Sequence, residues 1–172
     1  MPKWPKDELA ESDERTTLLG FLQHQRTFLE YKVRGVSEQA AREATCPPSD
    51  LTLIGLVCHL TDVERGWSQR GLAGRSVSGI YSSKDDSDAD LHPESDVTID
   101  GAFDRFWAEV EEAEKVYAAM GLDDLGPRVR PVRYSLRWVL VHLIEEYARH
   151  LGHADLIRQA IDGQVGDPPP QD

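Results

Sequence analysis

The chain has 172 residues, 40% of them hydrophobic, and a formal net charge of −12. The length suits one domain, and the apolar share is enough for a sizeable core. Nucleic-acid phosphates and anionic membrane surfaces repel so acidic a chain, so we expect neither as a partner. No apolar run reaches the roughly 18–20 residues that span a bilayer, and the N-terminus lacks a signal peptide, which predicts a cytoplasmic protein.

The first predicted helix covers residues 12–34, where apolar side chains recur three and four apart. Ser12 is its expected N-cap, and Gly35 is a good C-terminal stop. A short helix is predicted over residues 37–44 and ends before the pair Pro47-Pro48.

The second long helix is predicted from about residue 50 to residue 70. Its apolar residues are spaced at three and four, namely Leu53, Leu56, Leu60, Val63 and Trp67. Residues 75–97 are rich in serine and acids, so we expect a long crossover loop outside the core. The cysteines, Cys46 and Cys58, are too few for a disulfide framework, and both are expected to be thiols.

Two more helices are predicted in the second half of the chain, over residues 98–120 and 135–162. Ser135 is the expected N-cap of the last helix, and Gly163 has the position of a C-terminal glycine cap. With no useful strand alternation, these patterns predict an all-α fold, an antiparallel four-helix bundle with one long crossover loop. It would form a single domain over residues 1–163, followed by a disordered tail, 164–172.

The last helix carries polar side chains inside its apolar stripe. At 100° per residue, Leu143, Ala154 and Ile157 lie within about 40° of His150. His153 lies one turn on and Glu146 one turn back, both toward the same edge of that face. A buried imidazole costs free energy unless it finds a partner, so these residues need an explanation.

His59 has the same character on the second helix, because it lies three residues after Leu56 and four before Val63. Two such helices facing each other can place several imidazoles around one metal ion. The alternative is that hydrogen bonds satisfy these histidines. Asp62 has two interpretations, one in which it orients a ligand imidazole and one in which it pairs with Arg65.

The aromatic residues are expected mostly in the core, with one or two lining a substrate cleft; they are Trp67, Trp107, Trp138 and Tyr147.

The stretches LTLIGLVCHLTDVERGW, residues 51–67, and LVHLIEEYARHLGHADLIRQAIDG, residues 140–163, resemble the DinB/YfiT-like superfamily. The resemblance is to its actinobacterial branch with mycothiol-dependent members, and it covers nearly the whole chain. It implies a four-helix bundle that holds a divalent metal, zinc or nickel, with three side chains. By position, the ligand from the second helix is His59.

The resemblance leaves the ligands of the last helix open. Many members use two histidines four apart, but the residue four before His153 is Arg149. A related maleylpyruvate isomerase branch uses a glutamate four before a histidine, which corresponds to Glu146 and His150. Neutral imidazole is a good ligand for zinc and nickel. We therefore predict His59, His150 and His153 as metal ligands, with Glu146 as the substitute, and Glu146 and Arg149 as candidate catalytic residues.

Three protein ligands leave one position open, as in catalytic rather than structural zinc sites. The resemblance then implies a metal-dependent enzyme that transfers a low-molecular-weight thiol of the mycothiol type to small electrophiles, or a related hydrolase or isomerase. The alternative is a non-catalytic metal-binding or stress-related helical bundle, which a fourth protein ligand would favour. A homodimer is expected, since closed two-fold dimers are the commonest oligomers.

Overall fold

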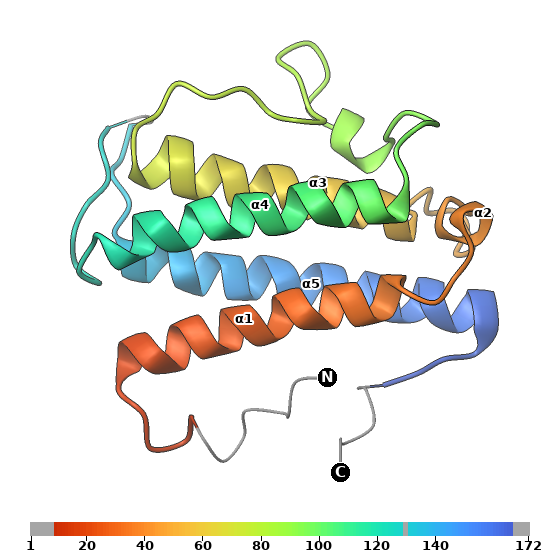
Figure 1. The fold of residues 1–172 in the computed structure, drawn as a ribbon, viewed down its shortest axis with the longest axis horizontal. Helices are drawn as coiled ribbons and strands as arrows, with labels where there is room; N and C mark the ends of the chain where they lie inside the picture. The colour runs from red at the N-terminus through yellow and green to blue at the C-terminus, as the bar shows by residue number, and fades with distance from the viewer. Residues whose placement is uncertain (1–8, 129–130, 167–172) are drawn as a thin grey trace. The chain divides into compact units, whose positions relative to one another are not determined.

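The computed structural model describes residues 9–128 and 131–166. Their helices, in chain order, are α1 (Glu14–Val33), α2 (Glu38–Ala41), α3 (Leu53–Arg65), the π-helix η1 (Gly66–Leu72), the short 3-10 helix η2 (Ala89–Leu91), α4 (Ile99–Ala118) and α5 (Leu136–Asp162) (Figure 1). Among the residues in these ranges, β-type pairing is limited to an isolated antiparallel bridge between Leu125 and Ser135. The all-α fold class is therefore confirmed.

Local hydrogen bonds set the helix ends. Asp13, not Ser12, caps α1, because its carboxylate accepts a hydrogen bond from the Thr16 amide at 3.0 Å. That hydrogen bond lowers the pKa of Asp13. Ser135 caps α5 as predicted, accepting from the Trp138 amide at 3.2 Å. Gly163, with a φ of +78°, follows α5 in the left-handed conformation that glycine adopts readily.

Contacts within the chain divide it into two compact units, each described by itself below. The first contains residues 1–53 and 140–172, with α1, α2 and most of α5. The second contains residues 54–139, with nearly all of α3 and with η1, η2 and α4. The last six residues of the predicted tail lie outside the described residues.

In the first unit, the end of α1 lies against the second half of α5 (Figure 1). Lys32 Nζ is 2.6 Å from a carboxylate oxygen of Asp155. The buried Arg158 donates hydrogen bonds to the backbone oxygens of Lys32 and Arg34, at 2.9 and 2.8 Å. These carbonyls end α1 without helical partners, so Arg158 acts as the C-terminal cap of that helix.

In the second unit, α4 packs along η1. Arg65 and Gln69 both donate to the buried Glu109, at 2.7 and 2.6 Å, and Arg75 pairs with Glu112 at 2.9 Å. The partner of Arg65 is Glu109, and the partner of the later residue Arg75 is the later residue Glu112. The contacts thus advance in the same order along both segments, so α3 and α4 run in the same direction. A long crossover is needed to bring the chain back to the end where α4 begins.

Two sequence-based expectations need correction. Residues 75–97 are largely irregular, but they do not lie wholly outside the core, since Asp90 is only 5% exposed. Trp138 is 44% exposed rather than a core residue, whereas Tyr147 is fully buried. Cys46 and Cys58 are free thiols, as expected. No helix among the described residues is long and apolar enough to span a membrane.

The Arg158 cap generates a stability prediction. Changing Arg158 to Ala leaves two carbonyls of α1 unsatisfied, and we expect a loss of about 2–4 kcal/mol in the free energy of unfolding. The matched control is Arg34→Ala, because Arg34 also pairs with an acid four residues away but is exposed; that change should cost less than about 0.5 kcal/mol. Urea unfolding followed by circular dichroism measures both. Equal losses in the two variants would contradict the capping role.

Candidate functional site

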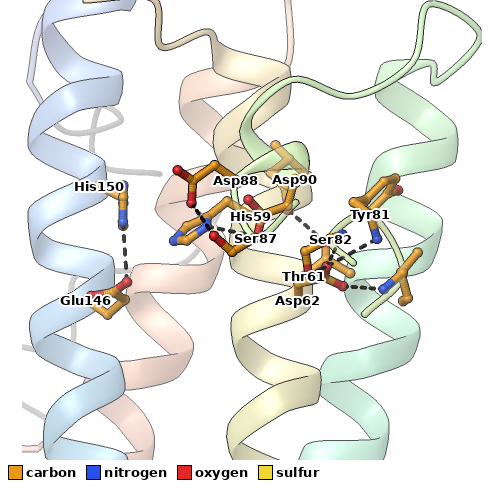
Figure 2. A network of polar contacts seen from close by, with 12 residues as sticks. His59, Thr61, Asp62, Tyr81, Ser82, Ser87, Asp88, Asp90, Glu146 and His150 are labelled. Atoms are coloured by element: carbon orange, nitrogen blue, oxygen red, sulfur yellow. Dashed lines mark hydrogen bonds and ion pairs between the residues drawn. The ribbon is translucent and has the colours of Figure 1, made fainter. Parts of the chain in front are cut away.

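His59 lies on α3, and its ring is held by a carboxylate from the crossover. Its Nδ1 is 3.1 Å from Oδ2 of Asp90, a buried residue of η2 (Figure 2). A carboxylate only accepts, so Nδ1 carries the hydrogen and donates it. In that tautomer Nε2 carries the lone pair, as in a metal-binding histidine with a carboxylate behind it.

Asp62 fulfils neither role that the sequence suggested for it. Its carboxylate accepts hydrogen bonds from the amides of Ile80, Tyr81 and Ser82, at 2.6, 3.1 and 2.7 Å, and from the Ser82 hydroxyl at 2.6 Å (Figure 2). Arg65 pairs with Glu109 instead. Asp62 therefore anchors the crossover to α3, and it is Asp90 that orients the His59 ring.

Sequence reasoning missed Asp90 because it lies in a run of acids that looks like a solvated loop. The one usable signal was local: Asp90 is flanked by Ala89 and Leu91, within an otherwise polar stretch. Such a flank favours a short turn that contacts the protein. The structure places the 3-10 helix η2 there.

Burial, followed by the nearby Cys58 thiol, raises the pKa of Tyr81 above its usual range. The phenol therefore stays neutral at neutral pH, and Tyr81 offers no phenolate as a base. Cys58 itself is fully buried.

A cavity of about 370 Å³ opens beside His59 within the second unit. Four of its lining residues come from η1, namely Gly66, Trp67, Arg70 and Gly71. In a π-helix the hydrogen bonds join residues five apart, so side chains four and five apart share one face. The wider turn thus directs this set toward one cavity, and Trp67 lines a cleft as expected for one or two of the aromatics.

The first unit contributes the other polar cluster, on α5. Oε1 of Glu146 is 3.4 Å from Nε2 of His150, and both side chains are largely buried (Figure 2). Two donors of a tetrahedral zinc ion with bonds of about 2.1 Å lie roughly 3.4 Å apart. This spacing and the carboxylate–imidazole chemistry therefore fit two ligands of one metal ion.

The remaining predicted residues surround this pair. Arg149 is exposed and donates to Oε2 of Glu146 at 3.0 Å, leaving Oε1 toward His150. The His153 ring lies 5.4 Å from that of His150, centroid to centroid. Its buried Nδ1 has no hydrogen-bond partner among the residues that the structure describes. His142 pairs with Glu145 at 3.4 Å.

Comparison with known protein families matches residues 17–163 to the family described as Mycothiol-S-transferase. The chain belongs to the mycothiol S-transferase family. This confirms the resemblance to DinB/YfiT-like proteins that the sequence indicated. The matched range contains His59, Asp62, Asp90 and the Glu146–His150 pair. No curated protein matches the chain.

The role of Asp62 in this family member generates a prediction about local stability. Changing Asp62 to Ala removes the acceptor of three consecutive amides, so hydrogen exchange at Ile80, Tyr81 and Ser82 should accelerate by at least about tenfold. The control is Asp88→Ala, whose exposed carboxylate accepts from the Ser87 hydroxyl but binds none of these amides. Unchanged protection of residues 80–82 in Asp62→Ala would refute the anchoring role.

Proposed function

We propose that this protein is a divalent-metal-dependent thiol S-transferase that joins a low-molecular-weight thiol of the mycothiol type to a small electrophile. Membership of the mycothiol S-transferase family supports the reaction class. In this reaction the thiol sulfur forms a bond to the electrophilic carbon, the thiol proton passes to solvent, and a leaving group departs with its electron pair. The expected homodimer stays a prediction.

We propose His59, Glu146 and His150 as the protein ligands of the metal. The observation that carries this proposal is the 3.4 Å spacing between Oε1 of Glu146 and Nε2 of His150. This distance favours Glu146 over His153 as the second ligand from α5. The resulting ligand set has a glutamate four residues before a histidine, which is the alternative pattern described for the maleylpyruvate isomerase branch. His153 is the competing candidate.

Two side chains then have positioning roles. Asp90 holds Nδ1 of His59 and so keeps Nε2 as the ligand atom. Arg149, predicted as catalytic, binds one oxygen of Glu146 and keeps the other toward His150. Removing either partner leaves a ligand free to rotate, which lowers metal affinity without removing a donor atom.

Zinc is the first candidate and nickel the second, because imidazole and carboxylate ligands suit both. A bound divalent ion with an open position lowers the pKa of a thiol and makes it a nucleophile at neutral pH. In this proposal the protein contributes three donor atoms and, in the second unit, a cavity beside His59 with room for a small molecule.

Metal content across a series of variants tests this proposal. His150→Ala leaves two ligands, too few to hold zinc firmly, so metal per chain should fall to near background while the helical circular dichroism spectrum is kept. Glu146→Gln should cause a similarly large loss, whereas Asp90→Asn should weaken metal binding by about 10–100-fold. Transfer activity with mycothiol should follow metal content across the series.

The matched control is His142→Ala, on the same helix but outside the proposed ligand set, which should leave metal content unchanged. His153→Ala decides between the two ligand sets. A large loss with His153→Ala and a small one with Glu146→Gln would make His153 the ligand. Full metal content in His150→Ala would mean that the proposed centre does not exist.

A further inference from the structure

The cavity beside His59 has a wall of packed aromatic rings. Trp67 and Tyr134 line the cavity, with ring centroids 5.2 Å apart at 89°. Trp138 packs against both, at 5.3 Å from Trp67 and 4.5 Å from Tyr134. Rings packed on one another in this way form a stiff apolar surface, which suits a flat partner better than a flexible polar one.

Arg70 is the cavity's cationic residue and has no ion pair among the residues that the structure describes. Its guanidinium lies over Gly66, where an added Cβ would come within 2.8 Å of Nη2. Of the two carboxylates of the cavity, Asp62 binds the crossover, and Asp90 binds His59 through Oδ2 while its buried Oδ1 has no hydrogen-bond partner among the described residues. Arg70 is thus the positive charge on this lining that can meet an anionic ligand.

The net charge of the chain, −12, repels anions over most of the surface. A guanidinium beside an aromatic wall supplies the local attraction that an anion needs, and it binds carboxylates through two parallel hydrogen bonds. At about 370 Å³, the cavity is near the lower end of the range for small-molecule sites. The cavity therefore has room for one small molecule.

We propose that this cavity selects the electrophile, and that it takes a small aromatic acid whose ring lies against Trp67 and Tyr134 and whose carboxylate binds Arg70. This inference rests on the proposed function and names the substrate class of the same site. In the corresponding reaction, the thiolate sulfur bonds to the ring carbon that carries a halide, and the halide leaves with the electron pair of its bond. Arg70 acts here on specificity rather than on the reacting atoms.

Equilibrium binding tests this proposal without requiring turnover. The two probes are 3-nitrobenzoate and 3-nitrobenzamide, which share a ring and differ in charge, titrated into the metal-loaded protein by isothermal calorimetry. The wild-type protein should bind the benzoate at least about tenfold more tightly. Arg70→Gln should remove this preference by weakening the benzoate alone. Trp67→Leu should weaken both probes, because it removes part of the wall that both rings contact.

The control is Lys115→Gln, which removes the same charge from an exposed position on α4 outside the cavity lining and should keep the preference. Equal binding of the two probes by the wild-type protein, no binding of either, or a preference that survives in Arg70→Gln would each overturn the proposal.

Turnover of 4-chloro-3-nitrobenzoate with mycothiol separates this proposal from the one on which it rests. Selective binding through Arg70 without any thiol transfer would leave the assigned cavity in place and remove the transferase function. The other outcome is equal kcat/KM for neutral and anionic electrophiles, in both the wild-type protein and Arg70→Gln. That result would support the transferase function and refute the proposal that Arg70 selects electrophiles by charge.

Discussion

The buried carboxylate of Asp62 accepts four hydrogen bonds from three consecutive residues of the crossover, and the position of the crossover beside α3 depends on them. A buried charge is costly unless it is well hydrogen-bonded, and three amides with a hydroxyl meet that need. The anchor fixes residues 80–82 beside α3. The same segment continues to η2, where Asp90 reaches back to His59. A sequence that looks like a surface loop thus becomes part of the functional site.

The chemistry of the site follows from hydrogen bonds that restrict the orientations of its side chains. The hydrogen bond from His59 to Asp90 selects one ring nitrogen for a ligand. Arg149 occupies one oxygen of Glu146 and leaves the other 3.4 Å from His150. On this account, the bound metal provides the reactivity that family membership indicates, and the chain provides donors that are oriented in advance. Such orientation is what keeps metal sites selective and tight.

The helices could be predicted because their signals are local. Apolar spacing, the caps at Ser135 and Gly163, and the inward position of His150 depend only on residues within a few turns. The roles of Asp62 and Asp90 could not be predicted, because both depend on where a long crossover folds back. The π-helical turn at residues 66–72 could not be predicted either, since a 3.6-residue period gives no sign that Gly66 and Gly71, five residues apart, line the same cavity. Spacing offered both His153 and Glu146, and the affinity of imidazole for zinc and nickel ranked His153 first, whereas the proposed ligand set takes Glu146 because of its 3.4 Å distance from His150.

The central claim is that one metal ion is bound by two imidazoles and one carboxylate of this chain, with an open position for a thiol. X-ray absorption at the metal edge of the zinc-loaded protein tests it most directly, because multiple scattering counts the imidazole ligands and the first shell distinguishes oxygen from sulfur. The account predicts two imidazoles with oxygen donors completing the shell, and one sulfur in place of an oxygen when mycothiol is added. Three imidazoles, or a first shell that does not change with the thiol, would contradict it.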